Sequence, residues 1–203
     1  MRSPGRSRLP RHERRALIVQ AARDEFVDVG LSGARTRSIA ERAGVAEALL
    51  YQHFDSKDDL FRAAVVDPLD HVMDVLADLD PAVPGDAATY RDNTRRYVVA
   101  VLEAMRESFA LLGVVLFEDR HDGETFYRGR MADLLDASIA AVRDNLEGWS
   151  HRHFDPEFSV PATFGMCWFL AVDAAYRGRD LDVEGLADQV VAMIFDGLAR
   201  PAT

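Results

Sequence analysis

Residues 36–57, TRSIAERAGVAEALLYQHFDSK, contain side chains that can form directional hydrogen bonds with the edges of nucleic acid bases. The amide of Gln52 offers the donor and acceptor pair that matches adenine, and the carboxylate of Glu47 can accept a hydrogen bond from the N4 amino group of cytosine. Each such contact discriminates between bases by about 1–3 kcal/mol. Both residues lie away from the apolar stripe of Leu50 and Phe54, so they are candidates for reading bases.

Two short helices are needed to hold these side chains in place. Thr36 is predicted to cap the first helix, whose buried face includes Ile39, and Gly44 tolerates the left-handed backbone that ends it. The second helix continues the buried stripe through Leu50 and Phe54, and a helix held in this way can lie in a major groove. The candidates for base reading on its opposite face are Glu47, Ala48 and Gln52.

One amphipathic helix is predicted before this pair and another helix directly after it. Ile18 and Phe26 belong to the apolar face of the preceding helix, and Gly30 ends it. Ser56 is predicted to cap the following helix, with Asp59 placed to return the capping bond. A helix–turn–helix pattern alone also occurs in helical domains without a nucleic acid partner, whereas the ordered succession of all these elements is a more specific signal.

The runs AARDEFVDVG, TRSIAERAGV and LLYQHFDSKDDLF, in this order, resemble the amino-terminal DNA-binding domain of the tetracycline-repressor (TetR) family of transcriptional regulators. The resemblance covers residues 14–66. It implies a ligand-responsive regulator, usually a repressor, that binds double-stranded DNA as a homodimer and is released by a small-molecule effector. A two-fold dimer presents two copies of the recognition helix to one face of the duplex, so the operator should be a palindrome, that is, an inverted repeat.

The resemblance also implies which residues contact the sugar-phosphate backbone and set the register without reading sequence. These residues are Thr36, Arg37, Tyr51, His53 and Lys57. The chain departs from the family pattern where Ala46 replaces a common Ser, Ala48 replaces a common Gly, and Glu47 places an acid that the family seldom has. Glu47 either reads cytosine or turns toward solvent, and Tyr51 either contacts phosphate or only packs the domain.

No alternating strand pattern is present, so the chain is predicted to be all-α. Residues 1–10 are expected to form a disordered basic arm, residues 11–56 the helix–turn–helix domain, and residues 57–203 a larger ligand-binding and dimerisation domain. The arm is either a solvated tail or a segment that reaches DNA through its arginines. Pro68 is expected to kink or interrupt its helix, and residues 118–124 are expected to be a polar break.

The last two helices, expected at about 161–177 and 183–199, are rich in apolar residues. Phe164, Trp168 and Val172 are distributed around the first of them, and a helix that is apolar on most sides must be covered on most sides. We therefore predict that this pair meets its symmetry mate in a four-helix dimer interface. The alternative is a helical core within a single chain.

The net charge of −10 is unevenly distributed, because residues 1–62 hold 12 Lys and Arg against 9 Asp and Glu, whereas residues 63–203 hold 12 against 25. The acidic total does not exclude DNA binding, since phosphate contacts depend on local cations. Cys167 is the only cysteine, which excludes an intramolecular disulfide and a multi-thiolate metal site. The apolar run at 160–172 is too short to cross a bilayer and no signal core follows the basic amino terminus, so we predict a cytoplasmic protein without a membrane partner.

The acidic part is expected to bind the effector, which we predict to be small and largely apolar. Bulky residues on its central helices are the candidates for effector contact, although such residues at helical spacing are more often ordinary core. They are Tyr97, Met105, Phe109, Phe117, Phe126, Trp149, Phe164 and Trp168. An effector can change DNA affinity only by binding two arrangements of the protein differently, and the helix from Ser56 through Pro68 is the candidate lever.

Two other classes of function remain open from the sequence. An enzyme would use His121 or a metal ion held near His151 and His153, where surface histidines are the alternative. A helical scaffold that binds only protein accounts for the dimer helices but leaves Tyr51 and Lys57 without a role. We predict no catalytic residue, no metal site and no cofactor.

Overall fold

The computed structural model describes residues 10–80, 86–118, 120–146 and 155–197. These residues form α-helices and two π-helical segments joined by short connections, with no strand among them, which confirms the all-α prediction. The chain divides into two compact units between Val66 and Asp67. The domain boundary predicted between residues 56 and 57 lies ten residues earlier, because residues 57–66 pack with the amino-terminal unit.

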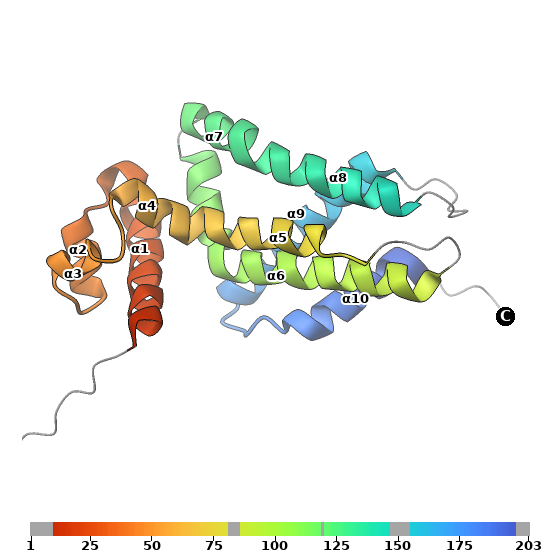
Figure 1. Cartoon of the computed structure of the whole chain (residues 1–203), viewed down its shortest axis with the longest axis horizontal. Coiled ribbons are helices and arrows are strands. Elements are labelled where there is room, and N and C mark those ends of the chain that lie inside the picture. The colour runs from red at the N-terminus through yellow and green to blue at the C-terminus, as the bar shows by residue number, and fades with distance from the viewer. Residues whose placement is uncertain (1–9, 81–85, 119, 147–154, 198–203) are drawn as a thin grey trace, which may run out of the picture. The chain divides into compact units, whose positions relative to one another are not determined.

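The amino-terminal unit contains α1 (Arg11–Gly33), α2 (Thr36–Arg42), α3 (Glu47–Leu50), α4 (Lys57–Phe61) and the π-helical segment η1 (Arg62–Val66) (Figure 1). Its core includes Ile18, Phe26, Ile39, Leu50 and Phe54, all at most 2% exposed. The prediction that these five residues are buried is therefore confirmed, whereas Val29, expected on the same face as Ile18 and Phe26, is 47% exposed. Gly30 (φ 70°) and Gly44 (φ 66°) have the left-handed backbone that breaks α1 and ends the turn after α2.

The carboxy-terminal unit contains α5 (Asp67–Ala77), α6 (Ala87–Phe117), α7 (Arg120–Phe126), η2 (Tyr127–Met131), α8 (Ala132–Leu146), α9 (Pro156–Tyr176) and α10 (Val183–Asp196). α6 is the central helix of this unit, since it contacts α5, α7, α9 and α10 (Figure 1). Asp86 and Asp182 cap α6 and α10 by accepting hydrogen bonds from backbone N–H groups in the first turn of each helix. Because α6 has four neighbouring helices, its apolar residues are buried on several sides, as the periodicity of the sequence predicts.

Two predictions of helix caps have different outcomes. The Ser56 hydroxyl accepts from the N–H of Asp59 at 3.1 Å, which confirms the cap of α4. The Asp59 carboxylate returns a bond to the N–H of Asp55 at 3.1 Å, one residue before the position expected for a capping box. The predicted cap by Thr36 is wrong, because Arg35 occupies the cap position and Thr36 is the first helical residue.

The polar break expected at residues 118–124 is also wrong, since most of it belongs to α7. Gly123 explains how a charged, glycine-containing segment packs as a helix. A Cβ atom at this position would lie 2.5 Å from the carbonyl oxygen of Leu116, which is closer than real Cβ contacts occur. The glycine therefore allows α7 to approach the end of α6 rather than marking a loop.

Pro68 does not interrupt its helix. The chain is helical from α4 through η1 to α5, and the wide π turn comes directly before the residue pair Asp67–Pro68. Proline has no N–H, so Pro68 cannot donate to the carbonyl group of Ala64 four residues earlier. The Nε–H of Arg23 on α1 donates to that oxygen at 3.0 Å. The expected kink is replaced by a π turn with a buried acceptor that a side chain from α1 satisfies.

One helix among the described residues, α9, is long and apolar enough by length and composition to cross a membrane. The sequence predicted none, because its uninterrupted apolar run is shorter than the helix that contains it. The core helix of a folded domain passes the same test. One face of α9 packs against α6 and α8, with Thr163, Phe164 and Cys167 in the interior.

Arg23→Ala is expected to lower the free energy of unfolding by about 1–3 kcal/mol, because the buried Ala64 carbonyl loses its side-chain donor. Pro68→Ala supplies a backbone N–H, so Arg23→Ala should be less destabilising in that background. A double-mutant cycle measured by urea denaturation gives the coupling between the two positions. Equal destabilisation in both backgrounds would contradict the link between Pro68 and Arg23.

Candidate nucleic-acid interface

A cluster of charged side chains fixes α2 on α1. The guanidinium of Arg42, at the end of α2, donates to Glu25 at 2.9 Å and to Asp28 at 2.5 Å. The Glu25 side chain is only 8% exposed, and a buried carboxylate requires a partner charge. These ion pairs set the direction of α2, and therefore the place where the Gly44 turn starts α3.

Three predicted DNA-contact residues are joined by hydrogen bonds. The hydroxyl of Thr36, at the start of α2, donates to Oε1 of Glu47 at 2.8 Å. The same hydroxyl lies 3.2 Å from the phenol oxygen of Tyr51, which follows α3. The bonds link the start of α2 to both ends of α3, so the backbone-contact candidates and the acid form one cluster.

The face of α3 opposite the core is open to solvent. Ala48 and Gln52 are exposed, and 48% of Tyr51 is exposed, whereas Leu50 and Phe54 are buried. Glu47 is half-buried because it leans toward α2. The three candidates for base reading therefore share one surface. Ala48 and Gln52 lie on its exposed part, whereas the Glu47 side chain is turned toward α2.

Two other predicted phosphate contacts have partners in the fold. Arg37 pairs with Glu41 at 3.1 Å on the exposed side of α2. The ammonium of Lys57 donates to the carbonyl oxygens of Leu31 at 2.8 Å and Ala34 at 3.4 Å. Since an ammonium has three N–H groups, Lys57 ties the end of α1 to the start of α4 and keeps one donor for another acceptor. No local sequence signal indicates this structural role.

Three arginines that the sequence analysis did not single out lie near His53. Arg11, Arg14 and Arg15 occupy the first turns of α1. Partial burial, and then the positive charges of these arginines, hold the pKa of His53 below its usual 6.5. The guanidinium of Arg15 lies 5.1 Å from the centre of the Phe54 ring. The signal in the sequence was their spacing, which puts all three on one face of a helix.

The candidates for effector contact are divided between the interior and the surface of the carboxy-terminal unit. Those that are buried are Tyr97, Met105 and Phe164. The indole N–H of Trp168 donates to the carbonyl oxygen of Phe109 at 3.2 Å, which joins α9 to α6. Phe117 is 72% exposed, so it does not line an enclosed cavity. Phe126 is half-buried. Trp149 lies outside the described residues.

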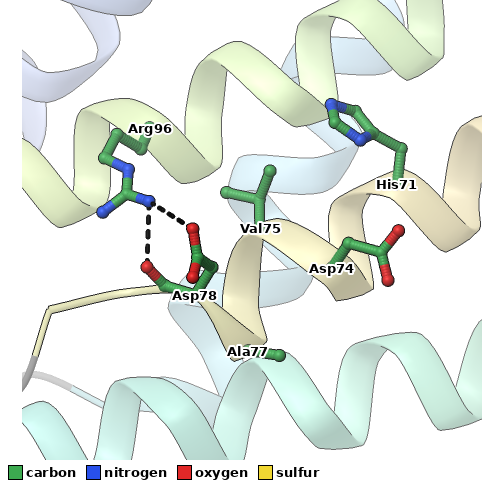
Figure 2. Close-up of a pocket in the computed structure, with 6 residues that line it drawn as sticks. All are labelled: His71, Asp74, Val75, Ala77, Asp78 and Arg96. Carbon is green, nitrogen blue, oxygen red and sulfur yellow. Dashed lines mark hydrogen bonds and ion pairs between the residues drawn. The ribbon is translucent and has the colours of Figure 1, made fainter.

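An open hollow of about 430 Å³ lies between α5 and α6 (Figure 2). It is lined by His71, Asp74, Val75, Ala77, Asp78 and Arg96. Arg96 donates to the carbonyl oxygen of Asp78 at 2.9 Å and lies 3.5 Å from its carboxylate (Figure 2). The rim is charged and none of the effector candidates lines it, so this hollow does not suit a largely apolar molecule.

Within the described part of the chain, no group of three or more His, Cys, Asp or Glu side chains could hold a metal ion. The alternative metal site at His151 and His153 lies outside that part, as does the predicted basic arm up to residue 9. Cys167 is buried, and burial raises the pKa of its thiol to about 12, so it remains a neutral thiol near pH 7.

Known proteins match both the amino-terminal unit alone and nearly the whole chain. The sequence profile described as "Bacterial regulatory proteins, tetR family" matches residues 18–64. The HTH-type transcriptional repressor KstR2 of Mycolicibacterium smegmatis is 39% identical over 200 residues, 92% of this chain and 91% of that protein. The activator FasR of the same organism is 45% identical over 67 residues, 33% of this chain and only 31% of FasR. The structure of FadR from Bacillus subtilis in complex with stearoyl-CoA has the same fold, with a TM-score of 0.58 at 16% identity over 91% of this chain and 99% of that one.

Removal of a positive charge near His53 is expected to raise its pKa. Because the folded pKa is below 6.5, the unfolded chain binds the proton first on acidification, so this histidine lowers the free energy of unfolding as the pH falls through 6.5. Arg14→Ala should raise the pKa of His53, whereas Arg37→Ala should leave it unchanged. An NMR titration of the imidazole Cε1–H resonance measures both variants. A His53 pKa at or above 6.5 in the wild-type chain would refute this reading of its surroundings.

Proposed function

The chain belongs to the TetR family of transcriptional regulators, and on this basis we propose that it is an effector-controlled repressor that binds an inverted-repeat operator as a homodimer. The single observation that carries the proposal is the open surface of α3 and of the turn after it, where Ala48 and Gln52 are exposed while Leu50 and Phe54 are buried. A helix anchored on one face and polar on the other suits the major groove. KstR2 of Mycolicibacterium smegmatis, which matches 92% of this chain, is itself named a repressor.

Gln52 and Ala48 read base edges in this proposal, while the surrounding residues hold the backbone. Gln52 pairs with adenine, and the methyl group of Ala48 contacts a thymine methyl or excludes a larger group. Thr36, Arg37, Tyr51, His53 and Lys57 contact phosphate and sugar. Support for this division comes from exposure, since Gln52 and Ala48 lie on the open face, whereas Thr36 and Lys57 already have partners in the fold.

Glu47 combines two roles in this arrangement. Its Oε1 atom accepts from Thr36, and a carboxylate has a second oxygen that can accept from cytosine N4. The Thr36 bond also keeps the negative charge toward α2 and away from the open face, where it would repel phosphate. We propose that Glu47 positions Thr36 and Tyr51 in the free protein and reads a cytosine where the operator offers one.

The dimer interface is proposed to form from α9 and α10 of each protomer. Phe158 is 73% exposed, Phe169 is 65% exposed and Tyr176 is 86% exposed, all on α9, the helix that is apolar enough to resemble a membrane span. The side chains of Ile194 and Phe195 on α10 are only partly covered. A second copy covers these residues in a four-helix arrangement, so no bilayer is required and the protein acts on DNA in the cytoplasm.

The effector is proposed to be a largely apolar molecule, such as one carrying an acyl chain, bound in the carboxy-terminal unit. The name of the FadR structure records stearoyl-CoA, which has a long acyl chain. Tyr97, Met105 and Phe164 supply buried apolar surface here. Burial raises the pKa of the Tyr97 phenol to about 12, so the hydroxyl keeps its proton and can donate to a polar atom of the effector.

The helical run α4–η1–α5 is proposed as the lever that couples the effector to DNA. It is the covalent connection between the two units, and its π turn lies directly before the boundary at Asp67. A continuous α-helical hydrogen-bond ladder resists bending, whereas the π turn interrupts that ladder, and its Ala64 carbonyl oxygen accepts from the Arg23 side chain. An effector that prefers one arrangement of this turn changes DNA affinity by the difference in its affinities, typically 1–3 kcal/mol in coupling energy.

Selection from a random oligonucleotide pool is expected to enrich an inverted repeat. Gln52→Ala should relax the preference at one base pair in each half-site, because a contact worth about 1–3 kcal/mol is lost. Tyr51→Phe should weaken all enriched sites alike, since it removes only the hydroxyl. Enrichment of no motif by the wild-type protein at moderate salt would reject the proposed function, and equal relaxation by both variants would reject the division between base and backbone contacts.

Phe169→Asp is expected to convert the dimer into monomers at micromolar concentration, because it places a charge in the centre of the proposed apolar interface. Tyr127→Asp is the matched control, since it introduces the same charge at a 45% exposed aromatic residue on η2. Sedimentation velocity measures the masses, and circular dichroism confirms that both variants keep their helices. A Phe169→Asp protein that sediments like Tyr127→Asp would exclude α9 from the interface.

A further inference from the structure

The start of α1 carries an arginine cluster on the face that is buried further along the helix. Arg11, Arg14 and Arg15 are spaced i, i+3 and i+4, and the same stripe continues to the fully buried Ile18. Glu13, at about 100° per residue, falls on the roughly opposite side of the helix. On this face of α1, arginines therefore take the place of apolar residues in the first turns, where the helix extends beyond the core.

These guanidinium groups lie beside the residues that directly follow α3. Arg15 stacks on Phe54, with 5.1 Å between its central carbon and the ring centre. Phe54 is 2% exposed, so this arginine is also a cover for the core. The positive charges of all three arginines act on His53, the neighbour of Phe54 and Gln52 in the chain. The cluster and the exposed end of the recognition helix thus form one continuous surface.

We propose that Arg11 and Arg14, with Arg15 and His53 beside them, each bind a phosphate group of the DNA strand that borders the groove occupied by α3. This inference rests on the proposed DNA-binding function and adds contacts from α1 that the helix–turn–helix pattern does not include. Arg15 is the positioning residue of the cluster, since its stacking on Phe54 fixes where the first turns of α1 lie relative to α3.

Phosphate is the partner that this chemistry fits. Guanidinium groups donate two parallel hydrogen bonds to phosphate oxygens and keep their charge at every physiological pH. Arg11 and Arg15 are exposed and Arg14 is half-buried, so the cluster lies at the surface of the amino-terminal unit, where a phosphate can reach it. His53 beside them adds an N–H donor of its own. A base-reading role is less suited, because bidentate recognition of guanine requires single arginines inserted into the groove rather than a group on an adjoining helix.

The test uses the full-length protein and an operator obtained by pool selection. Fluorescence anisotropy gives the affinity of the wild type, Arg11→Ala/Arg14→Ala and Arg120→Ala/Arg128→Ala over a range of KCl concentrations. The control pair also removes two arginines, both beside Glu124 in the carboxy-terminal unit. The first variant is expected to bind every selected site more weakly and to reduce the slope of log K against log[KCl] by about 2 per bound protomer, at about 0.9 per phosphate contact. The control variant should keep the wild-type slope.

Arg11→Lys/Arg14→Lys should restore most of the slope, since lysine keeps the charge. If thermal melting shows that the double alanine variant is unfolded, Arg11→Ala alone carries the test, with an expected loss of about 1 in slope. A slope equal to that of the control would overturn the inference, as would a change in the selected base sequence. Failure of the wild type to select any site would instead reject the proposed function, so the two failures are distinguishable.

Discussion

The candidate interface depends on the burial of two side chains behind a helix that is too short to exist alone. α3 has four residues, whereas isolated helices shorter than about 12–15 residues are marginal in water. Leu50 and Phe54, at 0% and 2% exposed, hold it against the rest of the unit. The position of every exposed group on α3 is therefore set by core packing. Substitutions in the core alter the interface even though they replace none of its exposed residues.

The polar residues of the interface are held by the fold before any partner arrives. Thr36 bonds Glu47 and approaches Tyr51, and Lys57 binds two carbonyl oxygens at the end of α1. Side chains that are already ordered lose less conformational entropy on binding, which favours affinity. The same bonds limit what each group can do, because an acceptor on DNA has to share or replace the partner that the group already has.

The sequence predicted the parts of this unit that depend on local signals. The left-handed Gly44, the Ser56 cap and the buried faces of the helices all follow from neighbouring residues. The errors concern partners that are distant in the chain. Thr36 has a helix-capping side chain but bonds Glu47, eleven positions on, and Arg23 reaches the Ala64 carbonyl 41 positions on. Neither pairing leaves a periodic trace, and the glycine of α7 resembles a loop signal although it serves a close helix contact.

The uneven distribution of charge along the chain explains why arginines at the start of α1 matter for binding phosphate. Residues 1–62 hold 12 Lys and Arg against 9 Asp and Glu, a net charge of +3, whereas residues 63–203 hold 12 against 25, a net charge of −13, so the larger unit repels phosphate. Repulsion of this kind is screened over about 8–10 Å at physiological salt, while contacts at the interface act at a few ångströms. Local cations therefore decide whether DNA is bound. With Glu47 adding negative charge at the recognition helix itself, the cations near α3 must offset more repulsion than a neutral residue at this position would create, and the arginines in the first turns of α1 add to Arg37 and Lys57 in doing so.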